Sequence, residues 1–162
     1  MSDFEDVLRC NFLGHVAMTR ALLPLLRCRE SQIVNVTSLA GMFGIAGYTA
    51  YASSKAAMVG FNDSLRNELA GTSVTVTNIV PSDIDTPMLV EETKTKPAAC
   101  RAVSGLAKPM PVGTAVERML TGIAKQKSEL LIVPFSSRFT VALARTLPTV
   151  FRAVIDRIAR RA

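Results

Sequence analysis

The fold follows from a short run of the 162-residue sequence, Gln32-Ile33-Val34-Asn35-Val36-Thr37, together with the helix after it. The run is rich in β-branched residues and predicts a strand. A loop punctuated by glycines follows, and residues 50–70, rich in Ala, Leu and Met, then predict a long helix closed by Gly71. A strand, a loop and a helix of these lengths are typical of one unit of a layered α/β fold.

The alternation continues on both sides of this unit. The further elements predicted are a helix over 3–28, kinked or interrupted at Pro24; a strand over 73–80 ended by Pro81; a flexible flap over 82–112 with one short helix; a helix over 114–127 capped at Thr114; and a buried strand over 129–133. Such strands are joined by right-handed crossovers, so we expect a parallel sheet. Sites in these sheets lie beyond the carboxyl ends of the strands, here near Ser38 and Ser82.

The basic charge of the chain is concentrated at its C-terminal end. The net charge is +6, and residues 135–162 hold six arginines against one acid, Asp156. A nucleic-acid interface would combine a charged face with a recognition motif or stacking aromatics, and the sequence has neither. We therefore predict no nucleic-acid partner, and we divide the chain into an α/β domain, residues 1–134, and a basic amphipathic helical tail, residues 135–162.

The tail predicts two helical segments separated by Pro148, with an apolar stripe along them. The stripe consists of Leu143, Leu147, Val150, Phe151, Val154, Ile155 and Ile158. Two explanations stay open. The stripe packs on its own domain or a sister subunit, or the basic segment 136–162 lies on an anionic membrane surface or docks on a partner.

Three other features limit the class of protein. The sequence has no uninterrupted apolar run of about 18 residues, so we expect no spanning helix. The acidic start of the chain is unlike a secretory signal or a transit peptide. Cys10, Cys28 and Cys100 lack metal or redox spacing. They predict reduced thiols, no metal site and a cytoplasmic protein, with peripheral membrane contact as an alternative.

Tyr51 and Lys55 are four residues apart on the predicted helix and therefore share a face. Reduction of a carbonyl by hydride needs a proton donor for the oxygen, and oxidation of an alcohol needs the same group as a base. A nearby ammonium stabilises a phenolate, so we expect Lys55 to lower the pKa of Tyr51. Ser38, at the end of the preceding strand, is placed to hydrogen-bond the same substrate oxygen.

Four motifs support this interpretation, because a Tyr-Lys pair on a helix is a weak pattern alone. They are Asn11-Phe12-Leu13-Gly14 with Leu22-Leu23-Pro24 after it; Ile33 to Gly41; Tyr51-Ala52-Ser53-Ser54-Lys55-Ala56-Ala57; and Val76 to Ser82 with Thr86. In this order and spacing they resemble the short-chain dehydrogenase/reductase family over residues 3 to 134. The resemblance implies part of a Rossmann-type, doubly wound parallel sheet.

The resemblance also implies a role for each matching residue. Tyr51 would give or take the proton, Lys55 would tune it and bind the nicotinamide ribose, and Ser38 would orient the substrate oxygen. Asn11 would hold a water that links Lys55 to solvent. The residues that would line the nicotinamide of NAD or NADP are Pro81, Ser82, Ile84 and Thr86. Tyr48 has Ala52, not a lysine, four residues on, and we interpret it as a wall of the pocket.

The sequence departs from the family pattern in two places. Ser82 stands where the family has a glycine, and its side chain would crowd the nicotinamide if the backbone there needs a positive φ. The glycine-rich turn that cradles the cofactor pyrophosphate is not in the sequence, and neither is the residue that selects NAD or NADP. By analogy with the family, roughly 80 to 110 residues would precede Met1.

Two functions stay open on the sequence alone. The first is NAD(P)(H)-dependent interconversion of an alcohol and a carbonyl, on an apolar, lipophilic small molecule that would fit the region around Met88, Leu89 and Met110. The second is a non-catalytic fragment that associates, through the helices 3–28 and 50–70, with a second copy or a full-length relative. An unpaired sheet edge would favour association in either case.

Overall fold

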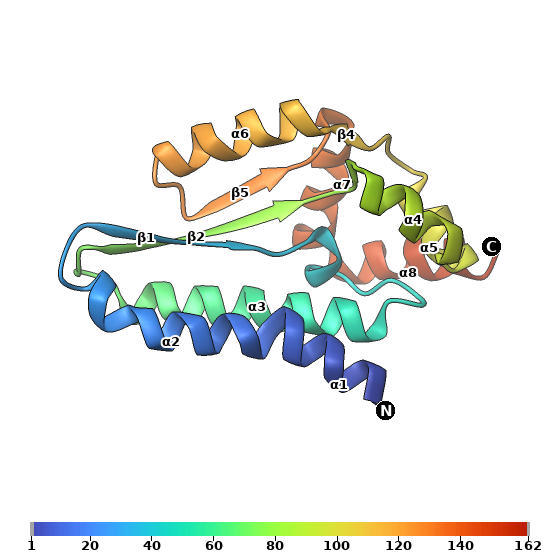
Figure 1. Ribbon diagram of the computed structural model, residues 1–162. Coiled ribbons are helices and arrows are strands. Elements are labelled where there is room, and N and C mark those ends of the chain that lie inside the picture. Colours follow the sequence, from blue (N-terminus) through green and yellow to red (C-terminus); the bar gives the residue numbers. More distant parts are fainter. Residues whose placement is uncertain (1, 162) are drawn as a thin grey trace.

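The computed structural model describes residues 2–161, and its centre is a three-stranded parallel sheet (Figure 1). The strands are β1 (Ser31–Val36), β2 (Val74–Pro81) and β5 (Glu129–Ile132), in the order β1-β2-β5. The helices α2 (Gly14–Leu26) and α3 (Thr49–Glu68) cover one face, and α6 (Val112–Ala124) covers the other. The predicted α/β class and parallel sheet are confirmed.

The central strand β2 is buried along most of its length, as expected for a parallel strand covered on both faces. Alternate side chains of β2 enter two different cores, because successive residues of a strand point to opposite faces. Val74 and Val76 pack with Leu65 and Leu69 of the α3 segment, whereas Ile79 packs with Ala115 beneath α6. The strand β1 lies at the edge of this sheet.

The first helical segment is interrupted at a different place from the one predicted. It consists of α1 (Ser2–Leu8), a π-helical stretch η1 (Arg9–Leu13) and α2, and Pro24 lies inside α2. Of the two predicted outcomes, a kink or an interruption at Pro24, the interruption is therefore wrong. A proline so near the C-terminus of a helix removes a single N–H donor, and the flanking Leu23 and Leu26 hold the last turn against the core.

A buried chain of hydrogen bonds joins α3 to the two strands beneath it. Asn35 Nδ2 donates to Asn62 Oδ1 at 2.7 Å, and Asn62 Nδ2 donates to Asn78 Oδ1 at 3.2 Å. Thr37 Oγ1 donates to the same Asn78 oxygen at 2.9 Å. These four residues come from β1, α3 and β2 and from the loop after β1, so they lock the three elements together.

Residues 82–112 are more regular than the predicted flap with one short helix. Two strands, β3 (Ile84–Asp85) and β4 (Met110–Pro111), pair in parallel, and two helices, α4 (Pro87–Thr95) and α5 (Ala98–Ser104), lie between them. Thr86 caps α4 by accepting a hydrogen bond from the Leu89 amide at 3.2 Å. The prolines do not interrupt these helices, because Pro87 and Pro97 stand at the two helix starts.

The last third of the chain follows the predicted order with shifted boundaries. The helix α6 starts at Val112 with Pro111 at its N-cap, so the predicted cap at Thr114 is wrong. Pro111 already begins the helix because its fixed φ and missing N–H suit that place. The tail forms α7 (Phe135–Thr146) and α8 (Pro148–Ala159), separated before Pro148 as predicted. Both lie at the end of the sheet to which the strands point (Figure 1).

Two glycines give opposite predictions for substitution by alanine. A Cβ at Gly41, in the short helix η2 (Leu39–Gly41), would lie 2.7 Å from the backbone carbon of Lys55, whereas a Cβ at Gly60 would meet open space. We expect Gly41→Ala to lower the free energy of unfolding by about 1 to 3 kcal/mol and Gly60→Ala to raise it by up to about 1 kcal/mol. Urea denaturation followed by circular dichroism measures both, and equal stability of the two variants would contradict the close approach of η2 and α3.

Candidate active site

Tyr51 and Lys55 lie on the same side of the first turns of α3, as their spacing predicts. The Lys55 ammonium is 5.7 Å from the centre of the Tyr51 ring. Its Nζ also donates a hydrogen bond to the Val36 carbonyl oxygen at 3.2 Å. Lys55 therefore connects the helix to the end of β1, and a lysine Nζ has further donors for a ligand.

Ser38 lies where β1 ends and η2 begins. Its Oγ accepts a hydrogen bond from the Ala40 amide at 3.1 Å, which caps η2. Its side chain also hydrogen-bonds Tyr51, which lowers the pKa of the phenol. The two hydroxyl groups predicted to hold a substrate oxygen are thus brought together from separate elements.

The predicted direction of the Tyr51 pKa is wrong for this structure. The pKa of Tyr51 is raised above its ordinary value, and burial is the largest cause, since a buried phenolate loses its hydration. The charges of Glu92 and Asp83 raise the pKa further, and the lysine that opposes them is Lys96. Burial also lowers the pKa of Lys55.

Asn11 lies in the π-helical stretch η1 and contacts Ser54, in the turn of α3 that also carries Tyr51 and Lys55. Its Nδ2 donates to Ser54 Oγ at 3.2 Å, and Ser54 Oγ in turn donates to the Tyr51 carbonyl oxygen at 2.7 Å. Ser54 is fully buried. Asn11 is therefore linked to the backbone of Tyr51 through one intervening hydroxyl.

The segment after β2 carries the four residues expected at the nicotinamide. Pro81 pairs with Ile132 at the end of the sheet, and the Ser82 amide donates to the Ile132 carbonyl oxygen at 3.1 Å. Ile84 lies in β3 and Thr86 caps α4. Within residues 2–161 the one non-glycine residue with a positive φ is Gln126. The backbone at Ser82 is therefore unstrained by its side chain.

A cavity of about 460 Å³ opens beside Ser38 and Tyr51. Tyr48 lines it, as predicted, and its ring lies 5.6 Å from that of Tyr51 in an edge-to-face arrangement. Part of the wall is apolar and comes from the tail, where Val141, Phe151 and Ile155 are buried side chains that line the cavity. The Phe151 ring packs 4.8 Å from that of Phe43. Part of the predicted stripe thus faces the chain's own fold.

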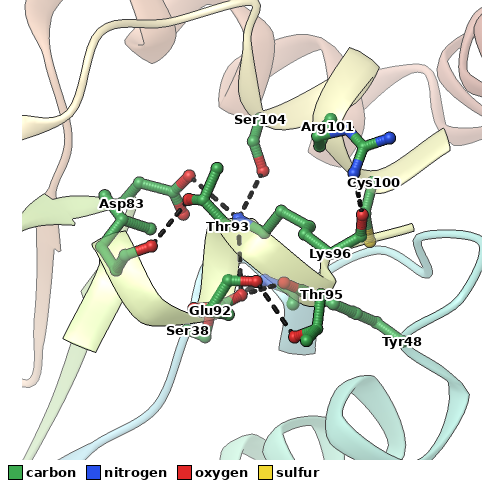
Figure 2. A network of polar contacts seen from close by, with 12 residues as sticks. Ser38, Tyr48, Asp83, Glu92, Thr93, Thr95, Lys96, Cys100, Arg101 and Ser104 are labelled. Atoms are coloured by element: carbon green, nitrogen blue, oxygen red, sulfur yellow. Dashed lines mark hydrogen bonds and ion pairs between the residues drawn. The ribbon is translucent and has the colours of Figure 1, made fainter. Parts of the chain in front are cut away.

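The opposite wall is polar and is held by a lysine that the sequence analysis missed (Figure 2). The Lys96 side chain is 3% exposed, and its Nζ lies 3.5 Å from Asp83 Oδ2, 3.4 Å from Glu92 Oε1 and 3.1 Å from Ser104 Oγ. Glu92 also accepts a hydrogen bond from the Tyr48 hydroxyl. Asp83 and Glu92 line the cavity.

This wall had no clear signal in the sequence. Lys94-Thr95-Lys96-Pro97 is a polar run of the kind that is usually exposed, and Lys94 does pair on the surface with Glu91. Two features single out Lys96 in three dimensions. The Arg101 guanidinium Nη1 donates a 2.6 Å hydrogen bond to the Lys96 backbone carbonyl oxygen, and a Cβ at Gly47 would lie 2.6 Å from the next residue, Pro97.

The residues present fit the nicotinamide end of a dinucleotide. Lys55 Nζ has donors left beyond its bond to Val36, and the Thr86 oxygen is used as an acceptor, which leaves its hydroxyl proton for a carbonyl. Both residues adjoin the end of the sheet at which Ser38 and Tyr51 lie. The residues that would hold the group are Tyr51, Lys55, Pro81, Ser82, Ile84 and Thr86.

Two searches of the described residues bear on other kinds of site. Among residues 2–161 there is no group of three or more His, Cys, Asp or Glu side chains placed to hold a metal ion. In the same part of the chain, each helix is too short or too polar to cross a membrane.

Several named proteins are similar in sequence. A mouse 3-ketodihydrosphingosine reductase is 40% identical over 120 residues, which is 72% of this chain and 36% of the relative. A 3-dehydrosphinganine reductase of Danio rerio is 38% identical over 117 residues, or 70% of this chain and 35% of the relative. The ketoacyl reductase HetN of a Nostoc species is 31% identical over 99% of this chain and 54% of its own length. The chain spans about a third to a half of these relatives.

Solved structures and a family model agree on the fold. A Burkholderia cenocepacia short chain dehydrogenase in complex with NADP matches with a TM-score of 0.75 at 22% identity, over 91% of this chain and 56% of that one. A Burkholderia phymatum relative in complex with NAD matches with a TM-score of 0.67 at 21% identity, over 83% and 54%. The short chain dehydrogenase model matches residues 1–97, more than half of the sequence. The chain therefore belongs to the short-chain dehydrogenase/reductase family.

Proposed function

We propose that the protein reduces the ketone of a long-chain, amphipathic substrate with NADH or NADPH. The observation that carries the proposal is the cavity in which the hydroxyls of Ser38 and Tyr51 meet beside an apolar wall. Two relatives support this substrate class by their names. The relatives at 40% and 38% identity are named as reductases of a keto form of a long-chain sphingoid base.

The site residues divide the work of the reduction between them. The cofactor, when bound, supplies the hydride. Ser38 donates a hydrogen bond that orients the ketone oxygen, and Tyr51 gives that oxygen its proton. Lys55 binds the cofactor ribose, and Asn11 orders the water through which the proton is replaced.

The raised pKa of Tyr51 supports reduction over oxidation. A phenol whose pKa lies above its ordinary value of 10.0 keeps its proton at neutral pH and can donate it, whereas alcohol oxidation needs the phenolate. The raised pKa comes first from the burial of the ring, and the carboxylates of Glu92 and Asp83 add to it.

The apolar wall supports an acyl chain as the far end of the substrate. Val141 of α7 and Phe151 and Ile155 of α8 are the buried apolar residues of the tail that face the cavity. Apolar ligand surface gains about 25 cal/mol for each Å² removed from water, so a long chain would add substantially to binding.

A second proposal concerns association, with another copy or with a full-length relative, through the first helical segment and α3. It is favoured by apolar side chains that remain exposed on that segment, namely Leu13 (53%), Met18 (61%), Leu22 (42%) and Leu25 (67%). An exposed apolar strip of this kind marks an interaction surface.

We also propose that the tail rests on an anionic membrane. Phe135 is 84% and Phe139 75% exposed on α7, and the guanidinium of Arg138 lies 5.9 Å from the centre of the Phe135 ring. Val150 and Val154 of α8 are about half exposed. Exposed aromatic side chains among arginines suit the interface between headgroups and acyl chains.

Replacement of Tyr51 by phenylalanine tests the proposed reduction. We expect Tyr51→Phe to lower the rate of ketone reduction by about 10² to 10⁴-fold, because the proton donor is lost. NAD(P)H oxidation with a long-chain ketone measures the rate, and circular dichroism checks the fold. Ser53→Ala, on an exposed position of the same helix, is the control and should keep its activity. Similar rates for Tyr51→Phe and the unmodified protein would refute the mechanism.

Charge placed on the strip of α2 tests association. We expect Leu25→Glu to shift the protein toward monomer in sedimentation velocity, since a buried carboxylate in an interface is costly. Leu120→Glu, on a similarly exposed leucine of α6 (61%), is the matched control and should leave the assembly unchanged. Association that survives Leu25→Glu would place the interface elsewhere.

Vesicle binding tests the membrane proposal. We expect Arg138→Glu to weaken binding to phosphatidylserine vesicles about tenfold or more, because each basic residue near the surface contributes about 1 kcal/mol and reversal changes two charges. Lys125→Glu, at the C-cap of α6, is the control. Binding by the unmodified protein should also fall with added salt. Equal binding by both variants would contradict a role for α7.

A further inference from the structure

The cavity beside Tyr51 has a charged end that ketone reduction does not require. Asp83 and Glu92 line it there, and Lys96 is the buried partner of both. The reduction itself needs an oxygen-binding hydroxyl, a proton donor and a hydride, which Ser38, Tyr51 and the cofactor provide. Two carboxylates in the wall therefore call for a separate explanation.

Burial differs between the members of this group. The Lys96 side chain is 3% exposed, whereas those of Asp83 and Glu92 are 36% and 42% exposed. The lysine is thus enclosed by protein, while the carboxylates keep part of their surface toward the cavity. A carboxylate has about four lone-pair sites, so each retains acceptor capacity after its contact with Lys96.

The balance of charge favours a positively charged ligand group. Lys96 offsets one of the two carboxylates, and Lys108, the other charged residue in the cavity wall, is exposed to solvent. Among Lys96, Asp83 and Glu92, one negative charge is therefore left over. An ammonium would supply both the missing charge and the donors for the free carboxylate oxygens.

The charged end is also close to the reacting centre. The Tyr48 hydroxyl donates to Glu92, and the Tyr48 ring lies 5.6 Å from that of Tyr51. A ligand group at Glu92 would therefore lie in the same cavity as an oxygen held at Tyr51 and Ser38, on the side of the Tyr48 ring. The apolar wall of Val141, Phe151 and Ile155 accommodates the rest of the molecule.

We propose that Asp83 and Glu92 bind an ammonium group that the substrate carries beside its ketone, so that they select amino ketones over neutral ketones. This inference rests on the proposed reduction and adds the identity of the polar head. Lys96 holds both carboxylates in place and joins α4 and the segment after β2 to one wall.

The test compares two probes of equal chain length, a medium-chain primary amine in its ammonium form and the corresponding alcohol. Isothermal titration calorimetry measures the binding of each to the purified protein below its micelle concentration. We expect the unmodified protein to bind the amine more tightly. We expect Glu92→Gln and Asp83→Asn each to weaken the binding of the amine about tenfold or more and to change that of the alcohol little.

Glu91→Gln is the matched control. Glu91 is the next residue on α4, but its carboxylate pairs with Lys94 on the surface and it does not line the cavity. This variant should bind both probes as the unmodified protein does. If Glu92 only supported the cavity wall, Glu92→Gln would weaken the binding of the amine and of the alcohol equally, because the whole wall would shift.

Three results would overturn the proposal: no preference for the amine in the unmodified protein, a preference that survives in both cavity variants, or a parallel loss for amine and alcohol. None of these results would refute ketone reduction, because that proposal is tested by the Tyr51→Phe variant. Turnover of neutral and amino ketones by the unmodified protein then separates the two ideas. Equal rates at subsaturating concentration would leave the reduction standing and remove the ammonium site.

Discussion

The buried hydrogen bonds through Asn62 set the position of α3 on the sheet, and the candidate site depends on that position. Asn62 is 2% exposed and bonds Asn35 of β1 and Asn78 of β2. A buried polar group without a partner costs about 1 to 3 kcal/mol, so sliding α3 along the sheet would break several bonds at once. The meeting of Tyr51 and Ser38 is thus fixed by residues that line no part of the cavity.

Much of the fold could be predicted because burial leaves a period in the sequence. The β-branched run before Ser38 and the Ala-rich helix after it were placed correctly, and the strand 73–80 differs from β2 by one residue at each end. The interruption at Pro24 was wrong because a pattern of residue types does not show how tightly the following turn is packed. The π-helical stretch at Arg9–Leu13 was not predicted from the sequence.

The residues of the candidate site that are close together in the sequence could be predicted, and the charged group that separate segments bring together could not. Tyr51, Lys55 and Ser38 are close in sequence and carry a motif, whereas Lys96 acquires its role from Asp83, Glu92 and Tyr48, which lie on three different segments. The sign of the Tyr51 pKa also failed for this reason. Charge from a neighbour on the helix is visible in the sequence, but burial by the segments over the ring is not.

The two halves of the cavity are therefore under different constraints. Tyr51 and Ser38 are fixed by the core, while the groups that would choose the substrate belong to the segment after β2 and to α4, α7 and α8. These three helices cover the end of the sheet (Figure 1). The ion pairs of Lys96 limit which substitutions these covering segments can accept. Removal of both of its carboxylates would leave an almost fully buried ammonium without a counter-charge, which is strongly destabilising. Recognition of the polar head and attachment of α4 thus depend on the same ion pairs, so a change of specificity at Glu92 also has to preserve the wall.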